Sequence, residues 1–274
     1  MPKIDVNREI EKITDHIKDY FVSNGNENTK AVIGISGGKD STIAAALLVR
    51  ALGRDRVIGV LMPQGKQKDI SDSRKVCEIL GIKSYEIDIG YACAELYRAV
   101  DEVYDNDKMV ASDPVVSTNT PARIRMATLY TVAALVGGRV INTGNASELY
   151  VGYTTKYGDL AGDFALFRNY YVRDILEIGI ALKELPSHLV LKAPGDGMSG
   201  KTDEDNLGFS YEVLDTYLIE GKYPDYDTLT KIETRHERNQ HKRVINLPCI
   251  PGPRRKWEKD EEKRYKPQSE TWEF

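Results

Sequence analysis

Apolar residues along the chain fall into two kinds of pattern. Continuous apolar runs at residues 31–35 and 57–62 are typical of buried strands, and the segments at 82–87 and 140–143 predict two further short strands. Longer segments between them carry apolar residues three and four positions apart and predict helices. Strands that alternate with helices predict a parallel sheet covered on both faces. The pattern therefore predicts an α/β fold with helices on both sides of a parallel sheet.

The remaining segments predict how these elements are connected. Apolar residues recur at helical spacing over residues 10–21 and predict an amphipathic N-terminal helix. Pro121 fits the first position of a further helix, and another helix is expected from residue 202 to about residue 221. Three segments without a clear period predict irregular structure: residues 106–121, 150–171 and 192–201. The segments 106–121 and 192–201 are candidates for a lid over the site.

Length and composition narrow the class of protein. The 274 residues fit a single domain spanning residues 1–274, with residues 254–274 as a C-terminal arm or tail of mixed charge. A net charge of −4, from 38 Lys and Arg against 42 Asp and Glu, gives no general signal for nucleic-acid binding. The N-terminus is charged, and no apolar run approaches the ~18 residues of a membrane span. We therefore expect a cytoplasmic protein with neither a membrane nor a nucleic acid as partner.

Three cysteines give no sign of a metal site or a disulfide framework. Cys77, Cys93 and Cys249 lie far apart and form no CxxC pair. Buried thiols in a reducing compartment are the simplest interpretation of this spacing.

A glycine turn between the first predicted strand and the next helix carries the strongest chemical signal. Residues 36–41 read Ser-Gly-Gly-Lys-Asp-Ser. Glycines let the backbone approach an anion closely, and a helix N-terminus directs N–H groups and roughly half a positive charge at it. Hydroxyls at Ser36, Ser41 and Thr42 add further donors. The turn therefore predicts a phosphate-binding site.

The turn differs from the Walker A loop of many nucleotide-binding proteins. Walker A requires a glycine five positions before the Gly-Lys pair and Ser or Thr directly after the lysine, where this chain has Ile33 and Asp40. Instead, Ser-Gly-Gly-Lys-Asp-Ser resembles the PP-loop of the ATP pyrophosphatases, which split ATP into AMP and pyrophosphate. In that family the loop grips the pyrophosphate and the aspartate, here Asp40, holds Mg²⁺.

A second carboxylate is expected on the same rim of the sheet. Glu148 follows the predicted strand at 140–143, and in open α/β sheets ligands sit beyond the carboxyl ends of the strands. Two carboxylates beside a phosphate site are what Mg²⁺ bound to a triphosphate requires. A glutamate in a loop more commonly caps a helix or pairs with a surface arginine, so Glu148 alone would not establish this site.

Further motifs extend the resemblance over most of the chain. Thr-Gly-Asn-Ala-Ser-Glu at 143–148 and Gly-Tyr-Thr-Thr-Lys-Tyr-Gly-Asp at 152–159, with Asp163, are similar to the central signature of the ammonia-dependent NAD synthetases. So are Thr202-Asp203-Glu204 and His241-Lys242-Arg243. The resemblance covers residues 10 to 243. It implies an adenine nucleotide alpha hydrolase-like fold with Rossmann-like layering.

The resemblance also implies roles for individual residues. ATP would be bound by Gly34, Ile35, Ser36, Gly37, Gly38, Lys39, Asp40, Ser41, Thr143 and Thr202. Deamido-NAD, the dinucleotide with nicotinate in place of nicotinamide, would be bound by Arg123, Lys156, Asp163, His241 and Lys242. Asp40 and Glu148 would ligate Mg²⁺, and Asp40, Glu148 and Lys156 would be the catalytic groups.

The chain departs from the family pattern at a phosphate-binding lysine. Val172 occupies that position, next to Arg173, and Arg168 lies nearby. We hypothesise that Arg173 or Arg168 supplies the missing charge. Asn145 also stands where the family usually has Asp, and Ala165-Leu166-Phe167 replaces a Pro-Leu pair.

The implied reaction is the ATP-dependent amidation of deamido-NAD to NAD, the final step of NAD biosynthesis. The nicotinate carboxylate would attack the α-phosphorus of ATP to form an NAD-adenylate, and ammonia would then displace AMP. Glutamine-dependent relatives carry an additional amidase domain, for which this chain has no residues left, so free ammonia is the expected donor. The family also implies a homodimer.

Two other classes of function stay open at this point. The chain could be another PP-loop ATP pyrophosphatase, either a tRNA-modifying enzyme or a different carboxylate-activating ligase. The scattered cysteines and acidic balance disfavour the tRNA-modifying enzymes. It could also be a nucleotide sensor without catalysis, but such a protein would not need both Asp40 and Glu148.

Overall fold

The computed structural model describes residues 4–67, 70–104, 109–192 and 202–243. All five of its strands are parallel and lie in the order β3-β2-β1-β4-β5. They are β1 (Lys30–Gly34), β2 (Val57–Leu61), β3 (Lys83–Glu86), β4 (Gly138–Asn142) and β5 (Phe164–Ala165). The first four confirm the predicted strands. The two-residue β5 lies inside the segment expected to be a loop, and it is too short to show a pattern.

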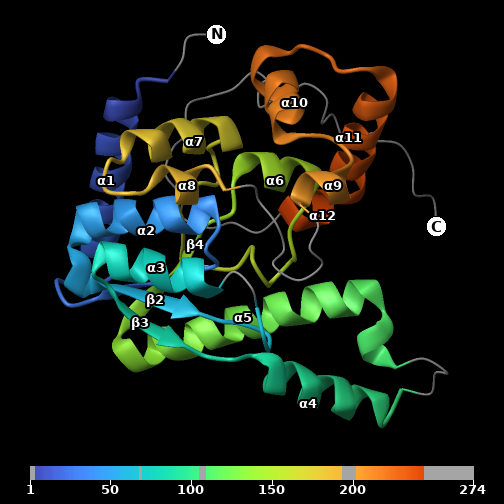
Figure 1. Cartoon of the computed structure of the whole chain (residues 1–274), viewed down its shortest axis with the longest axis horizontal. Coiled ribbons are helices and arrows are strands. Elements are labelled where there is room, and N and C mark those ends of the chain that lie inside the picture. The colour runs from blue at the N-terminus through green and yellow to red at the C-terminus, as the bar shows by residue number, and fades with distance from the viewer. Residues whose placement is uncertain (1–3, 68–69, 105–108, 193–201, 244–274) are drawn as a thin grey trace, which may run out of the picture.

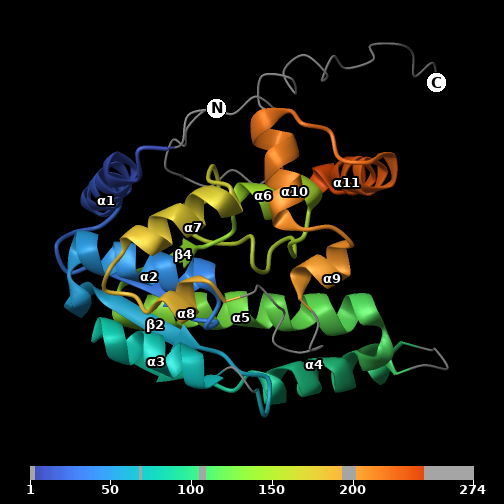
Figure 2. The same ribbon diagram turned by 45° about the horizontal axis from the view of Figure 1, so that its top comes forward.

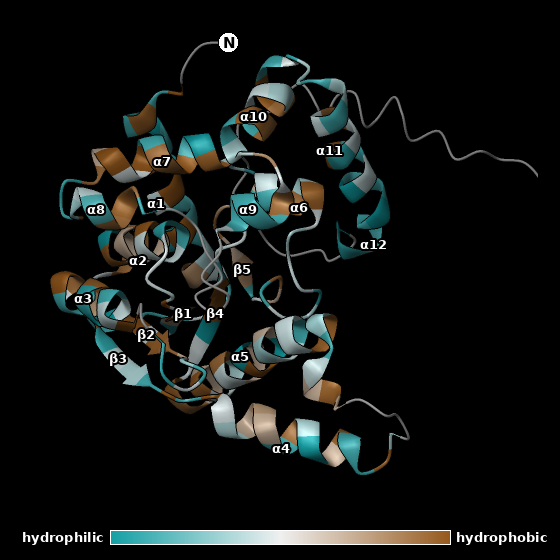
Figure 3. Cartoon of the chain, turned by 45° about the vertical axis from the view of Figure 1, so that its right-hand side comes forward, coloured by the Kyte–Doolittle hydropathy of each residue, from teal (hydrophilic) through white to brown (hydrophobic). Residues whose placement is uncertain are grey.

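Helices cover both faces of this sheet, as predicted (Figures 1 and 2). Ala31 and Ile33 point to one face and belong to the apolar core on that face. Val32 points to the other face and belongs to a separate apolar core there. One face carries α1 (Val6–Ser23), α2 (Lys39–Leu52), α3 (Ile70–Leu80), α7 (Val172–Ala181) and α8 (Ser187–Val190), and the other carries α4 (Gly90–Asp101) and α5 (Pro114–Val136). Figure 3 shows the apolar residues concentrated at β2 and on the helices around it.

A second group of helices packs beside the carboxyl end of the sheet (Figure 1). Its core contains Tyr150, Tyr171, Leu214 and Ile232, which are buried together. The group consists of α6 (Ala146–Val151), α9 (Asp203–Leu207), α10 (Tyr211–Asp215), a π-helical turn (Thr216–Glu220), α11 (Tyr226–Arg238) and α12 (Gln240–Arg243). Short 3₁₀ turns at Arg54–Arg56 and Val110–Ser112 complete the described elements.

Two predictions about helix boundaries are wrong. α5 begins at Pro114, because Asp113 caps it by accepting hydrogen bonds from the N–H groups of Val115 and Val116; Pro121 therefore lies inside the helix. The single helix expected over residues 202–221 is divided, because Gly208 adopts a left-handed conformation with φ of 78° and ends α9.

Several expectations fall on residues outside the described part. These are the irregular segment at 193–201, the C-terminal arm at 254–274 and Cys249. The other two cysteines, Cys77 and Cys93, are buried free thiols, as expected. Within the described ranges, we find no helix with the length and apolar character needed to span a lipid bilayer.

A buried aspartate joins the second group of helices to the sheet. Asp215, at the end of α10, is 1 % exposed. Its carboxylate accepts a hydrogen bond from the Ser147 hydroxyl at 2.6 Å and another from the N–H of Arg173 at 2.8 Å. Ser147 in turn accepts a hydrogen bond from the N–H of Val172 at 3.1 Å. Asp215 thereby fixes the start of α6 against the start of α7.

We predict that Asp215→Asn lowers the free energy of unfolding by about 1–3 kcal/mol at pH 7. The amide has only one oxygen, so its NH₂ group must face either the Ser147 hydroxyl or the Arg173 N–H. Urea denaturation measures the loss. Asp5→Asn is the matched control, because Asp5 caps α1 at the surface and Asn caps a helix equally well.

The pH dependence of this difference gives a second readout. Burial raises the pKa of Asp215 to about 6, although the hydrogen bonds from Ser147 and Arg173 oppose the shift. Because the folded protein binds this proton more tightly than the unfolded chain, the ionised carboxylate costs stability above that pKa. The wild type should therefore gain stability over Asp215→Asn as the pH falls from about 7 to about 4. A loss no larger than that of Asp5→Asn, or a gap that narrows on acidification, would contradict this role.

Candidate active site

The turn at residues 35–38 connects β1 to α2 and is held by its own hydroxyl groups. Ser41 Oγ accepts a hydrogen bond from the N–H of Ser36 at 3.3 Å, and the Ser36 and Ser41 hydroxyls are 3.1 Å apart. Ser36 Oγ also accepts a hydrogen bond from the N–H of Gly38 at 3.2 Å. Gly37 has φ of 75°, and a Cβ there would lie 3.1 Å from Ser73 Oγ. The chain thus needs glycine at this point to form the turn.

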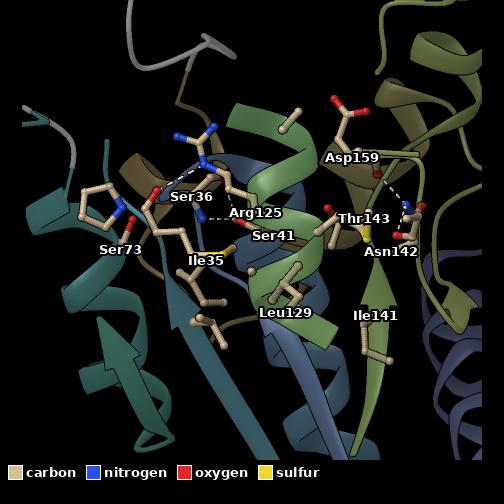
Figure 4. Close-up of a pocket in the computed structure, with 18 of the residues that line it drawn as sticks. Ile35, Ser36, Ser41, Ser73, Arg125, Leu129, Ile141, Asn142, Thr143 and Asp159 are labelled. Atoms are coloured by element: carbon tan, nitrogen blue, oxygen red, sulfur yellow. Dashed lines mark hydrogen bonds between the residues drawn. The ribbon is translucent and has the colours of Figure 1, made fainter. Parts of the chain in front are cut away.

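A cavity of about 300 Å³ opens beside this turn. Its walls include the ends of three neighbouring strands, with Ser36 after β1, Met62 after β2 and Thr143 after β4. Figure 4 shows Ser36 and Ser73 on one side, Asn142, Thr143 and Asp159 on the other, and Arg125 between them. The cavity lies at the carboxyl ends of β1 and β4, where the strand order reverses. From β1 the chain continues to β2 and β3 on one side of β1, and then to β4 on its other side. Open α/β sheets bind ligands at such a point.

Arg125 is a residue of this cavity that the sequence did not single out. It lies on α5 and donates a hydrogen bond from Nε to the carbonyl of Met62 at 3.2 Å. Arg123, which was predicted to bind deamido-NAD, is not among the residues lining the cavity. Helix residues two positions apart point in different directions, so only one of the two can enter. This periodicity was the available signal, but it required knowing which face of α5 meets the sheet.

Asp40 and Glu148 occupy the first turns of the helices that follow β1 and β4. Glu148 forms a capping box with Asn145: its Oε2 accepts a hydrogen bond from the Asn145 N–H at 3.1 Å, and Asn145 Oδ1 accepts one from the Glu148 N–H at 2.9 Å. Burial and the nearby charge of Asp40 raise the pKa of Glu148. The two carboxylates are therefore close enough to influence each other, as the rim argument predicted.

The chemistry of these groups fits a hard cation. Asp40 Oδ1 is buried and has no hydrogen-bond partner among the residues that the structure describes. An unsatisfied carboxylate oxygen beside a second carboxylate is suited to Mg²⁺, which prefers oxygen ligands and takes only one or two carboxylates besides phosphate oxygens. In the described ranges, no three His, Cys, Asp or Glu side chains gather as a metal cluster. A cation held by Asp40 and Glu148 would therefore need phosphate oxygens as further ligands.

A buried lysine lies against the pair. Lys39 is 2 % exposed, and its Nζ is 3.0 Å from Asp40 Oδ2. Burial lowers the pKa of Lys39, but Asp40, Glu148 and Asp203 together raise it by more, so its ammonium stays charged. Asp203 follows Thr202, which caps α9 by accepting a hydrogen bond from the Asp205 N–H at 3.1 Å. The start of α9 therefore approaches the turn, as the role predicted for Thr202 requires.

The residues predicted to bind deamido-NAD fall into two places, and none of them lines the cavity. Arg123 Nε donates a hydrogen bond to the Lys156 carbonyl at 3.3 Å. Lys242 Nζ donates to the carbonyls of Gly152 and Thr154, both at 2.7 Å, and His241 beside it is exposed. These contacts gather Arg123, Lys156 and Lys242 around residues 152–157.

Asp163 lies apart from this group. Its Oδ2 accepts a hydrogen bond from the N–H of Val140 at 2.7 Å, which fixes the approach of β5 to β4. Its contact with deamido-NAD stays a prediction.

Arg173 has partners of its own. Its guanidinium contacts Glu220 Oε1 at 2.8 Å and Thr216 Oγ1 at 2.8 Å, both in the π-helical turn. Neither partner belongs to the turn at residues 35–38, so the hypothesis that Arg173 replaces the family's lysine gains no support from this geometry. Val172 itself is buried in the apolar core of the second group of helices.

Known proteins resemble this chain over most of its length. A relative in Thermoplasma acidophilum named NH(3)-dependent NAD(+) synthetase is 35% identical over 253 residues, covering 89% of this chain and 97% of its own. The structure of NMN synthetase from Francisella tularensis superposes with a TM-score of 0.80 at 31% identity, covering 89% of this chain and 98% of that one. NAD+ synthetase from Burkholderia pseudomallei gives a TM-score of 0.71 at 26% identity, covering 90% and 93%. The model of the NAD synthase family matches residues 9–247, and the chain therefore belongs to that family.

Proposed function

We propose that the chain is an ammonia-dependent ligase that converts deamido-NAD to NAD at the expense of ATP. The observation that carries this proposal is the unsatisfied carboxylate oxygen of Asp40, which lies beside Glu148 at the end of a phosphate-binding turn. This chain matches 97% of the length of the Thermoplasma relative that is named for this reaction.

The turn at residues 34–41 would hold the triphosphate of ATP. The N-terminus of α2 supplies N–H groups and a partial positive charge, and Ser36 and Ser41 supply hydroxyls. Thr143 lines the same cavity, and Thr202 would close over the nucleotide from α9. Pyrophosphate would leave into this turn.

Mg²⁺ would be held by Asp40 and Glu148, with phosphate oxygens of ATP as further ligands. When bound, it neutralises charge on the phosphates and polarises the bond to the leaving pyrophosphate. Lys156 would add a positive charge at the acceptor end of the site. Its carbonyl contact with Arg123 keeps the two cations on neighbouring segments.

The reaction itself needs no nucleophilic side chain. An oxygen of the nicotinate carboxylate forms a bond to the α-phosphorus, and the bond to pyrophosphate breaks. Ammonia then forms a bond to the activated acyl carbon, AMP leaves with the electron pair of the acyl–oxygen bond, and the ammonium product loses a proton to solvent. The protein contributes by holding two anionic substrates together and by excluding water from the adenylate.

A second acceptor is favoured by one observation. The NMN synthetase structure superposes with a TM-score of 0.80, against 0.71 for the Burkholderia NAD+ synthetase. The mononucleotide with nicotinate as its base carries the same reacting carboxylate as deamido-NAD. The two acceptors differ by an AMP moiety. The residues that distinguish them must therefore lie away from the reacting carbon.

We also propose a homodimer in the cytoplasm. Large apolar residues on or next to α4 and α5 are exposed, including Tyr91, Val103 and Leu135, at 81%, 84% and 82%. We propose that these residues contribute to the association surface. Buried free thiols at Cys77 and Cys93 agree with a reducing compartment.

The acceptor and the nitrogen donor are tested in one assay. Purified protein receives ATP, Mg²⁺ and either deamido-NAD or nicotinate mononucleotide, with ammonium chloride or glutamine as donor. We expect NAD from deamido-NAD with ammonium and no amide with glutamine. A higher kcat/KM for the mononucleotide would establish the second acceptor instead, and AMP release without either amide would contradict both.

Removing either proposed metal ligand should abolish most of the activity. We expect Asp40→Asn and Glu148→Gln each to lower kcat by about 100-fold or more, because charge on the departing pyrophosphate loses its stabilisation. Initial rates over a range of Mg²⁺ concentrations measure the effect. Glu184→Gln is the control, because Glu184 pairs with Arg50 at the surface of α2. Variants that keep wild-type rates would place the cation elsewhere.

Charge placed on the α5 surface should separate the proposed dimer. We predict that Leu135→Asp yields monomers in sedimentation velocity at concentrations where the wild type is dimeric. Val22→Asp, at the end of α1 and 78% exposed in the wild type, should not change the sedimentation coefficient. A monomeric wild type, or a dimer unaffected by Leu135→Asp, would contradict this surface.

A further inference from the structure

Lys39 occupies an unusual position for a lysine. It is the first residue of α2, and its side chain is 2 % exposed, whereas lysine is almost never fully buried unless it is paired. Its Nζ lies 3.0 Å from Asp40 Oδ2 and 5.6 Å from the centre of the Tyr211 ring. The ammonium is thus enclosed between the phosphate-binding turn and the start of α10.

The surroundings of this ammonium are acidic. Besides Asp40, the carboxylates of Glu148 and Asp203 interact electrostatically with Lys39. Three segments that follow separate parts of the fold therefore place carboxylates around one cation: the start of α2, the start of α6 and the start of α9. Without it, Asp40 and Glu148 would repel each other in a poorly solvated site.

The hydrogen bonding of Asp40 divides its two oxygens. Oδ2 accepts a hydrogen bond from Lys39, while Oδ1 is buried and, within the described part of the chain, has no hydrogen-bond partner. One oxygen is therefore satisfied by a resident cation, and the other is left for a ligand. Lys39 thus compensates part of the negative charge of the carboxylate pair, but not all of it.

We propose that Lys39 is a resident counter-cation of the Asp40–Glu148 pair, which holds the pair together before substrate arrives and weakens divalent-cation binding to the nucleotide-free site. This inference rests on the proposed function, because that function places Mg²⁺ at the same pair. The Lys39 ammonium, which contacts Asp40 Oδ2, offsets negative charge on the pair. A divalent cation therefore gains less from the protein alone and binds well only with the negative charge of the triphosphate. The cation then enters together with ATP.

Mn²⁺ binding without nucleotide tests this directly, because the protein-bound ion loses the sharp electron paramagnetic resonance signal of free Mn²⁺. We compare the wild type with Lys39→Met and Lys39→Gln, which remove the charge and keep much of the side-chain length. Both should bind Mn²⁺ at least about tenfold more tightly than the wild type. The matched control is Lys18→Met, which removes a lysine paired with Asp15 at 3.1 Å on the surface of α1. It should leave Mn²⁺ binding unchanged.

A double variant locates the gain. Adding Glu148→Gln to Lys39→Met should return Mn²⁺ affinity to the wild-type level or below it, because one ligand is then lost. A gain that persists in the double variant would place the ion elsewhere and overturn the proposal. Equal Mn²⁺ affinity in the wild type and both neutral variants would also overturn it and would leave Lys39 as a packing partner of Tyr211.

Folding and the proposed function are separated by two further arms. If a neutral variant melts early without metal, the proposal requires Mn²⁺ to restore its melting temperature, and failure to do so counts against it. A non-hydrolysable ATP analogue is then added to every protein. Suppose that Mn²⁺ binds the wild type in the presence of the analogue, and that all variants bind Mn²⁺ equally in its absence. This result overturns the present inference but leaves the proposed function intact. Mn²⁺ that binds none of the proteins even with the analogue contradicts the proposed cation site as well.

Discussion

The parallel pairing of β1 with β4 is the constraint on which the candidate site depends. Residues 30–33 of β1 lie in register with residues 138–141 of β4, so both strands end at the same edge of the sheet. Each is followed by a helix whose first turn carries a carboxylate, Asp40 on α2 and Glu148 on α6. More than one hundred residues separate the two in the sequence. The sheet brings them together because neighbouring parallel strands must end side by side.

Electrostatics then sets what this edge can bind. Two helix N-termini and the hydroxyls of Ser36 and Ser41 favour anions, while Asp40 and Glu148 favour a cation. These opposite preferences are both satisfied by a triphosphate with its metal ion. The Lys39 ammonium balances part of the acidic charge before substrate arrives, and Asp215 fixes α6 so that Glu148 keeps its place. Binding and stability are thus coupled through the same few helix ends.

Local sequence patterns were sufficient for the sheet and the turn. Apolar runs predicted β1 and β2, because buried parallel strands are continuously apolar, and shorter segments with Ile or Val predicted β3 and β4. The Ser-Gly-Gly motif predicted the turn between β1 and α2. Contacts between distant segments were not accessible in this way. The choice of Arg125 over Arg123 depends on which face of α5 meets the sheet, and the buried Asp215 resembles any acidic residue near a helix end. Pro121 misled the prediction because proline is common at a helix start, whereas Asp113 and Pro114 provide the actual one.

The central claim is that the carboxylates at the ends of β1 and β4 together hold the cation of ATP. A crystal structure of the protein with Mn²⁺ and a non-hydrolysable ATP analogue tests it most directly, because Mn²⁺ is located by its anomalous scattering. The account predicts one strong peak in contact with an Asp40 oxygen, a Glu148 oxygen and phosphate oxygens of the analogue. A peak bound only to phosphate, or at a place away from both carboxylates, would contradict it.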